Sequence, residues 1–477
     1  MKGSLGQAGR FHAVRPALDR QALREYFNTR IRWPAGTSVS AVAIRRFWPG
    51  SRDRVDVEYD LKLRTSAQPD GTTVTLYARH PALNGEAGAE RTAAELSEHG
   101  LAGLSFIDPR LDVTFHSFDR DPSLPQIGRC LDPSFMTARL AALQRRGTDA
   151  ALALPDEAVD CRPMAYRRGK RIVIRYRNAS LGSSARGLVG KSYADDRGAA
   201  LAEVHRRLGD HLAWTTSGLV RLPAAVGYDP ELRMVLANWA GSSTPVPPRC
   251  SPESWARCAA ATLVALQSAR LPDLPRHDER RHWEVLERWH AAIADLCPDL
   301  YSRAQSLVQL LAAAWDALSP RPPVVVHGDF YESQLIVKRR TTTIVDLDTL
   351  AWGDECLDLG NYLAHQWLWC LEKGLPPESY ASIVRAMLEA YESQAFSIDE
   401  TALACYWAGS LFRVGAIHAF RDRTARYTVP LWRLIEPVLG QGPEALDLPA
   451  VRRMLLEPDS HDMSLAAASG GRRDASS

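Results

Sequence analysis

Paired cysteines, long apolar runs and an excess of one charge sign are all missing from this 477-residue sequence. The eight cysteines are scattered without a C-x-x-C pair, so neither a zinc site nor a disulfide framework is indicated. No apolar run reaches about 18 residues and no charged-then-apolar leader is present, which predicts a cytoplasmic protein without a membrane segment. The formal charge of +2 leaves no electrostatic argument for nucleic acid or a membrane surface as a partner.

The length predicts about two to three domains, of which residues 1–155 are predicted to be an accessory α+β domain. Alternating apolar residues, a turn at Asp70-Gly71 and helix-start signals predict its elements. The predicted helices cover residues 20–30 and 90–98 and begin again at Asp132, and the predicted strands cover residues 55–63, 74–77 and 113–115. None of these segments carries recognisable chemistry. The small, polar residues 459–477 are predicted to be disordered.

The residues that carry chemistry are concentrated at 324–358. Three valines, the loop HGDFYESQ and a second apolar run predict a strand, a polar loop and a strand, and the following strand ends in IVDLD. Two carboxylates that leave neighbouring buried strands, Asp329 and Asp346, can converge on one point. Phosphoryl transfer needs this arrangement: one Asp deprotonates the attacking hydroxyl, while an amide oxygen and another Asp hold the Mg²⁺ that bridges the phosphates.

The ordered set H-G-D-x-x-x-x-Q, I-V-D-L-D, G-D and D-L resembles the aminoglycoside phosphotransferase and choline kinase family, which has a protein-kinase-like fold. The resemblance covers about residues 161–458 and implies ATP and Mg²⁺ as cofactors. It implies Asp329 as the catalytic base and Gln334 and Asp346 as metal ligands. Gln334 stands where the family usually has Asn, and the maltokinase-type branch also has Gln there; Gln keeps the carbonyl oxygen one methylene further out. Asp348 either reaches a second metal or is a solvated acid.

Two further residues of this stretch are interpreted as structural. In the kinase-like arrangement His327 is more often a brace for the catalytic loop than a general base. Asp358 is likewise predicted to accept hydrogen bonds that hold the loop.

A lysine and a glutamate upstream fit the nucleotide side of such a site. Only six of the 58 basic residues are lysines, and Lys191 lies on a predicted strand before a helix that carries Glu203. The resemblance implies that Lys191 binds phosphates and pairs with Glu203. The alternative is a surface lysine and a solvated glutamate. The scarcity of lysine favours the functional interpretation, because a phosphate contact on a strand suits a slim ammonium group.

Two other segments also resemble parts of a nucleotide site. The strand over residues 234–241, with Asn238 and Trp239, resembles the hinge whose backbone meets the adenine, and a simple edge strand is the alternative. The hairpin over residues 162–176 would cover the nucleotide phosphates, and a plain hairpin is equally compatible with its sequence.

The predicted fold is an α+β, two-lobed protein-kinase-like structure with an extra N-terminal α+β domain. Its predicted parts are the accessory domain at 1–155, the β-rich small lobe at 156–241, the helical large lobe at 242–458 and the tail at 459–477. The predicted function is ATP-dependent transfer of the γ-phosphate to a hydroxyl of a small polar acceptor: an aminoglycoside, an amino sugar or another sugar or alcohol. The alternative is a catalytically weak pseudokinase that binds nucleotide and acts as an interaction module.

The acceptor remains open between two classes. If several of the acids near the loop line the acceptor side, the anionic field would favour an amino-bearing acceptor; these acids are Asp329, Glu332, Asp348, Asp354 and Glu355. If Glu332 and Glu355 face solvent, as charged residues mostly do, a neutral carbohydrate is favoured.

Overall fold

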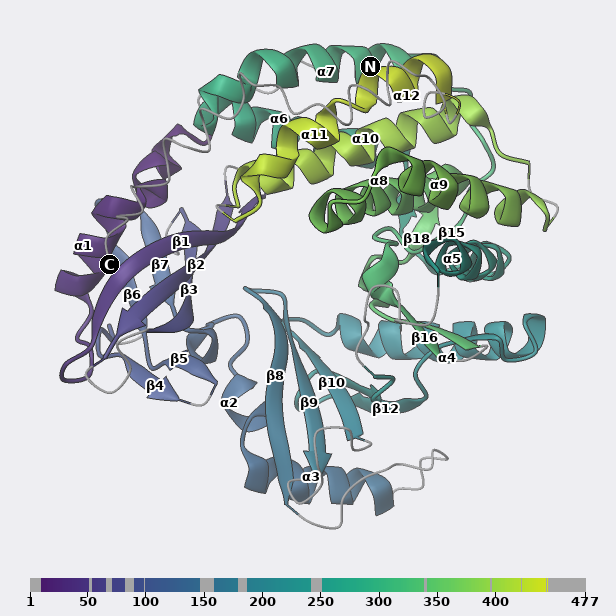
Figure 1. Ribbon diagram of the computed structural model, residues 1–477. Helices are drawn as coiled ribbons and strands as arrows, with labels where there is room; N and C mark the ends of the chain where they lie inside the picture. The colour runs from purple at the N-terminus through teal and green to yellow at the C-terminus, as the bar shows by residue number, and fades with distance from the viewer. Residues whose placement is uncertain are drawn as a thin grey trace, which may run out of the picture.

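The computed structural model describes residues 10–50, 54–65, 71–81, 90–97, 99–145, 158–178, 187–241, 251–338, 341–394, 397–421, 423–442 and 444. The predicted tail at 459–477 lies outside these residues. Figure 1 shows an N-terminal sheet, a second sheet and a large helical region, so the α+β, two-lobed arrangement is confirmed. Within the described part of the chain, no helix is long and apolar enough to cross a membrane.

The N-terminal part is a five-stranded antiparallel sheet in the order β1-β2-β3-β7-β6. Its elements are η1 (His12–Leu18), α1 (Arg20–Arg30), β1 (Ser38–Pro49), β2 (Val55–Arg64), β3 (Thr72–His80), β4 (Glu95–Ser97), β5 (Gly100–Ala102), β6 (Ser105–Asp108), β7 (Val113–His116), η2 (Phe118–Arg120), α2 (Ile127–Cys130) and α3 (Pro133–Arg145). Alternate residues of β2 are buried, as the sequence predicts. Phe27 of α1 packs edge-on against Phe115 of β7, so α1 covers the buried face.

The predicted helix over residues 90–98 is wrong. Ala93 forms a bridge with Arg32, Arg91 exchanges backbone hydrogen bonds with Ser105, and β4 pairs with β5. These cross-strand bonds satisfy the backbone of the segment, and tertiary pairing outweighs the helix propensity of its Glu and Ala residues. The helix predicted to begin after Asp132 is confirmed, because the Asp132 carboxylate accepts hydrogen bonds from the first helical N–H groups.

The small lobe is a second five-stranded antiparallel sheet, in the order β12-β13-β10-β9-β8. Its elements are β8 (Val159–Arg167), β9 (Arg171–Asn178), β10 (Gly187–Tyr193), α4 (Arg197–Thr215), β11 (Val220–Arg221), β12 (Ala225–Asp229) and β13 (Met234–Asn238). Met136 and Leu140 of α3 share one apolar cluster with Ile172, Ile174 and Tyr176 of this sheet. The domain division at residue 155 therefore stays a prediction, and the packing of α3 favours counting that helix with the small lobe.

The large lobe is mostly helical and carries two small sheets. Its elements are α5 (Pro252–Gln267), β14 (Arg276–His277), α6 (Glu279–Leu296), α7 (Pro298–Asp316), β15 (Val324–Val326), η3 (Glu332–Gln334), β16 (Leu335–Lys338), β17 (Thr341–Ile344), η4 (Leu347–Thr349), β18 (Ala351–Gly353), α8 (Glu355–Lys373), α9 (Pro377–Glu392), α10 (Glu400–Ala419), η5 (Ala425–Tyr427), α11 (Thr428–Trp432) and α12 (Ile435–Gln441). Fully buried tryptophans fill its core: Trp255, Trp315, Trp367, Trp407 and Trp432.

The N-terminal sheet connects to the large lobe through aromatic packing. Figure 1 shows the long strand β1 reaching the end of the helical region. There Phe47 stacks on Phe420 at a centroid distance of 4.2 Å, and Trp48 meets Trp289 edge-on at 5.7 Å. The backbone N–H of Phe11 also donates to the carboxylate of Asp295 on α6 at 2.6 Å.

The same sheet connects to the small lobe. Tyr77 of β3 packs edge-on against Tyr166 of β8 at 4.6 Å. Asp121 accepts hydrogen bonds from the Tyr166 hydroxyl and from the Gly169 N–H, each at 2.6 Å. The turn between β8 and β9 is therefore held by the N-terminal part.

We expect Phe47→Ala to lower the free energy of unfolding by about 3–5 kcal/mol, because a fully buried ring in the interface would leave a cavity. Urea denaturation followed by tryptophan fluorescence measures the change. Leu310→Ala is the control, because Leu310 is exposed on α7 and its truncation should change stability little. Equal midpoints for Phe47→Ala and wild type would contradict a structural role for this contact.

Candidate active site

A cavity of about 540 Å³ lies between the small-lobe sheet and the β16–β17 hairpin of the large lobe. Its apolar lining includes Val173 and Val189 from the small lobe and Ile336 and Ile344 from the hairpin. Residues 237–241, at the end of β13 and just after it, line one edge. Apolar walls with a few polar groups are typical of a site for a flat organic ring.

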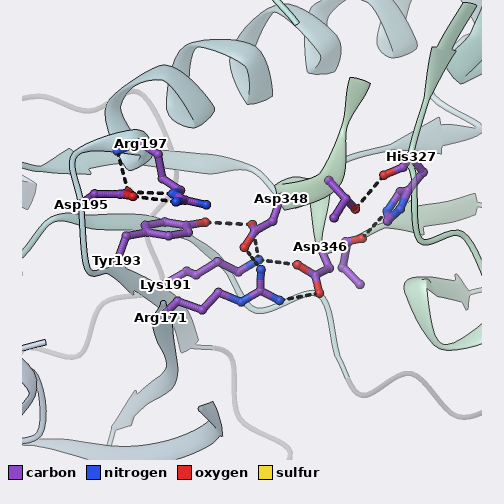
Figure 2. Close-up of polar contacts among 10 residues, drawn as sticks. Arg171, Lys191, Tyr193, Asp195, Arg197, His327, Asp346 and Asp348 are labelled. Carbon is purple, nitrogen blue, oxygen red and sulfur yellow. Dashed lines mark hydrogen bonds and ion pairs between the residues drawn. The ribbon is translucent and has the colours of Figure 1, made fainter. Parts of the chain in front are cut away.

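Charged side chains from both lobes meet in this cavity (Figure 2). The Lys191 ammonium donates to Asp346 Oδ1 and Asp348 Oδ1, each at 2.8 Å. Arg171 donates from Nη2 to Asp346 Oδ2 at 2.9 Å and also pairs with Asp348. The Tyr193 hydroxyl donates to Asp348 Oδ1 at 2.9 Å. These contacts join the small lobe to the large lobe.

Strand register and one unusual backbone conformation produce this arrangement. Lys191 lies opposite Val173 and Tyr193 lies opposite Arg171 in the β9–β10 ladder, so these side chains share one face of the sheet. On the other side, Asp346 adopts left-handed backbone angles, φ 64 and ψ 57, directly before η4. A non-glycine residue in this region costs about 1–3 kcal/mol, and such residues cluster at functional sites.

The charges in this group depend on one another. Burial alone would raise the pKa of Asp346, but Lys191 and Arg171 together hold that pKa below its usual range. Burial lowers the pKa of Lys191 to about 8, against the opposing effect of Asp346. A ligand that replaces the carboxylates beside Lys191 must therefore itself carry negative charge.

Asp358 and His327 hold the catalytic loop in place. Asp358 accepts hydrogen bonds from the backbone N–H groups of His327 at 2.6 Å and Gly328 at 2.9 Å, which confirms its predicted loop-holding role. The His327 ring donates from Nε2 to the Val345 carbonyl at 3.0 Å, as a brace would. Gly328 has φ 77, and an added Cβ would lie 2.6 Å from the Thr349 carbonyl oxygen, so the loop needs glycine here.

Asp329 lines a second cavity, which shares no lining residue with the first. Its Oδ1 lies 3.8 Å from Nη2 of Arg413, and its side chain is 29% exposed. Arg413 also donates to Asn361, whose amide in turn donates to the Phe330 carbonyl at 2.9 Å. The carboxylate of Asp329 is thus positioned by its neighbours and is accessible from the second cavity.

The predicted metal ligands Gln334, Asp346 and Asp348 all line the first cavity. Gln334 is buried. Its backbone carbonyl accepts a hydrogen bond from the Val345 N–H at 3.0 Å, which ties the loop to the residue before Asp346. Among the described residues, no three His, Cys, Asp or Glu side chains gather as a metal site. Two carboxylates and one amide oxygen nevertheless fit the oxygen preference of Mg²⁺, which commonly uses few protein ligands and completes its shell with water and phosphate.

The structure does not bring Glu203 to Lys191. Glu203 is exposed and pairs with Arg206 one turn further along α4 at 2.7 Å. Leu201 and His205 of the same helix line the cavity. Successive helical residues are about 100° apart, so residue 203 points away from the face that 201 and 205 share. The expected ion pair is wrong for this structure, and Asp346 and Asp348 are the partners of Lys191.

The sequence interpretation missed Arg171. Arg171 and Val173 are two residues apart on β9 and so share a face, which is the face of Lys191. The sequence predicts that side chains along β9 alternate between the two faces of the sheet. It does not predict the register in which β9 pairs with β10.

The predicted hinge residues Asn238 and Trp239 line the first cavity. The Trp239 N–H donates to the Gly187 carbonyl at 2.8 Å and the Asn238 N–H to the Ala224 carbonyl at 2.9 Å. The side-chain oxygen of Asn238 is buried and has no hydrogen-bond partner among the described residues. That amide is therefore available to a ligand, whereas the two backbone N–H groups are already used.

Both alternatives for Glu332 are wrong, because it neither lines an anionic acceptor site nor faces solvent. Glu332 is buried beneath the loop and lies outside the linings of both cavities. It accepts a hydrogen bond from Gln366 at 3.0 Å, and burial raises its pKa to about 7. Asp354, another of the acids considered for the acceptor side, instead caps α8 and pairs with Arg321.

The Glu332 carboxyl should make stability fall as pH rises. Its folded pKa of about 7 lies above the ordinary value of 4.5, so the stabilisation is complete below pH 4.5 and is lost as pH rises through 7. We expect Glu332→Gln to remove about 3 kcal/mol of the pH-dependent change in the free energy of unfolding. Gln keeps a hydrogen-bond acceptor for Gln366 and does not ionise. Denaturation midpoints between pH 5 and 8 measure the difference from wild type. Glu25→Gln, at an exposed position, is the control, and parallel curves for Glu332→Gln and wild type would contradict the assignment.

Residues 177–404, somewhat less than half of the chain, match the model of the phosphotransferase enzyme family. No curated protein matches the chain. Similar solved structures include a choline kinase from Cryptosporidium parvum (11% identity, 67% of this chain and 100% of that chain covered, TM-score 0.45). Another is a spectinomycin phosphotransferase in complex with ADP and spectinomycin (10% identity, 66% and 98% covered, TM-score 0.41). TM-scores of this size carry no conclusion about substrate or mechanism. Residues 177–404 are therefore similar to the phosphotransferase enzyme family, which indicates an enzyme that transfers phosphoryl groups.

Proposed function

We propose that the protein transfers the γ-phosphate of ATP to a hydroxyl group of a small polar acceptor. The observation that carries this proposal is the pair of cavities that one braced loop helps to line. Lys191, Gln334, Asp346 and Asp348 line the first cavity, and Asp329 lines the second. A donor nucleotide and an acceptor could thus reach the same loop from two separate cavities.

The first cavity suits a nucleoside triphosphate. Its volume of about 540 Å³ lies within the range of about 300–1,000 Å³ that is common for small-molecule sites. Its apolar walls would enclose the base, and the Asn238 side-chain amide offers a hydrogen-bond partner at the edge. Lys191 and Arg171 would bind the phosphates, which supply the negative charge that these two buried cations need.

Asp346, Asp348 and Gln334 would hold Mg²⁺, whose charge neutralises the β- and γ-phosphate oxygens when it is bound. In the structure Lys191 and Arg171 balance the two carboxylates. Binding of a metal–nucleotide pair therefore exchanges one set of charge partners for another. This exchange keeps every buried charge compensated, as a buried site requires.

Asp329 would act as the general base. Its carboxylate would take the proton of the acceptor hydroxyl as that oxygen bonds to the γ-phosphorus, and the bond to the β-phosphate oxygen breaks to release ADP. Arg413 would hold the carboxylate in position from 3.8 Å. The loop that carries Asp329 is fixed by Asp358, so the base needs no large rearrangement.

Replacement of the base gives the direct test. We expect Asp329→Asn to lower kcat by about 10²–10⁴-fold while ATP binding stays unchanged, because Asn cannot accept the proton. ADP release with an acceptor panel measures turnover, and calorimetry measures ATP binding. Asp210→Asn on the exposed side of α4 is the matched control. ATP binding by the wild type without turnover of any acceptor would favour the pseudokinase alternative, and full activity of Asp329→Asn would exclude this role for Asp329.

The proposed metal ligands make a second prediction. Asp346→Asn should abolish turnover, because it removes the negative charge that the metal and Lys191 both need. Gln334→Asn should retain turnover with a higher Mg²⁺ requirement, because the amide oxygen is kept but lies one methylene further back. Mg²⁺ titrations of ADP release measure both. Loss of activity in Gln334→Asn together with full activity in Gln334→Ala would contradict direct ligation.

A further inference from the structure

The second cavity, of about 190 Å³, is built from all three parts of the chain. Strands β1, β2 and β3 of the N-terminal part contribute one wall, and the turn between β8 and β9 contributes another. The catalytic loop, with Asp329 and Tyr331, and helices α8 and α10 complete it. A cavity that includes the proposed base and is separate from the first cavity is the position for the acceptor.

The lining of this cavity is strongly basic. Six cationic side chains contribute to it: Arg46, Arg167, Arg168, Lys170, Arg413 and Arg421. The acidic side chains of the lining are Asp56, Glu58 and Asp329. The imidazoles of His365 and His418 add no charge near neutral pH, because burial and neighbouring arginines lower the pKa of both.

The acidic side chains of the lining do not neutralise its excess of positive charge. Asp56 is already occupied by Arg79 at 2.8 Å and Arg54 at 2.9 Å, and neither of these arginines lines the cavity. Glu58 lies 3.7 Å from Arg46. Asp329 faces Arg413 and is the proposed base. Arg167, Arg168, Lys170 and Arg421 are therefore left without an acidic partner from the cavity lining.

Two of these cations have donor atoms that no described residue satisfies. Arg168 is only 5% exposed, and its Nη2 is buried without a hydrogen-bond partner among the described residues. The Nε atom of Arg421 is likewise buried without a hydrogen-bond partner among the described residues. Burial and the nearby charge of Arg79 lower the pKa of Arg168 to about 9, and burial together with Arg46 lowers the pKa of Arg421 to about 10. Guanidinium groups that other arginines repel and that have buried, unused donor atoms form a site for an anion.

We propose that the acceptor carries an anionic group, a phosphate or a carboxylate, which the basic side chains at this three-part junction bind while its hydroxyl faces Asp329. This inference rests on the proposed kinase function and specifies its substrate class. An amino-bearing acceptor would meet uncompensated positive charge, which disfavours it by repulsion. The volume of about 190 Å³ lies below the usual range of about 300–1,000 Å³, which favours a compact acceptor over a multi-ring one.

The first test compares acceptors on one skeleton. Purified full-length protein with ATP and Mg²⁺ is given glucose, glucosamine, a glucose phosphate and gluconate, and ADP release is measured. We expect the phosphate or carboxylate compound to have a kcat/KM at least about tenfold above the neutral and amino compounds. Preference for the phosphate or for the carboxylate identifies the anionic group. Equal or better use of glucose or glucosamine would overturn the inference while upholding the kinase.

The second test removes single charges. Lys170→Met and Arg421→Met should each raise the acceptor KM about tenfold and leave the ATP KM unchanged, and Lys170→Arg should restore binding. Arg280→Met is the control, because Arg280 is 84% exposed on α6, away from both cavities. Lys170 is exposed at a turn, so its replacement should leave folding intact even if Arg421→Met proves unstable. A rise in the ATP KM instead of the acceptor KM would assign these cations to the nucleotide and overturn the inference.

A binding measurement separates this inference from the proposed function. Calorimetry titrates inorganic phosphate and the glucose phosphate into protein saturated with ADP and Mg²⁺, so that the first cavity is filled. Binding that Lys170→Met weakens supports the inference even if none of the acceptors is turned over. The inference would be overturned if neither inorganic phosphate nor the glucose phosphate bound to the wild type.

Discussion

The structure depends on the ion pairs that Lys191 and Arg171 make with Asp346 and Asp348 across the two lobes. Buried ion pairs contribute little net stability, because desolvation offsets much of the attraction between the charges. Their position is better explained by the charged groups that they keep available for a ligand. Two cations on neighbouring strands and two acids around a left-handed turn are kept charged and close without solvent, and each set can take a new partner. A phosphate chain with its metal satisfies both sets at once.

The N-terminal part acts on this site through packing. Aromatic contacts hold β1 against the large lobe, and Asp121 holds the turn between β8 and β9. The N-terminal part holds the tip of this turn, and Arg171 lines the first cavity while Arg167, Arg168 and Lys170 line the second. One hairpin thus contributes cations to both cavities.

The catalytic loop shows why the acids of this region have different roles. Asp358 and Glu332 are buried and have raised pKa values, and each accepts hydrogen bonds within the protein. Asp346 is partly buried, and two cations lower its pKa against the effect of burial. Asp329 alone of these four lines the second cavity. Environment, rather than residue type, separates the loop-holding acid, the metal-side acid and the proposed base.

The sequence by itself determined the two-lobed α+β fold, the strands on either side of the loop that carries Asp329, and the choice of Gln334, Asp346 and Lys191, which line one cavity. These features follow from local periodicity and from ordered motifs, which are properties of short segments. Only the tertiary structure decided which partner Lys191 takes, that Arg171 joins it, and that residues 90–98 form strand pairs. It also decided the charge of the second cavity, because Arg46, Lys170 and Arg421 come from three distant segments. Which charges meet depends on strand register and on packing between the parts, and these long-range contacts leave no periodic signal in one sequence.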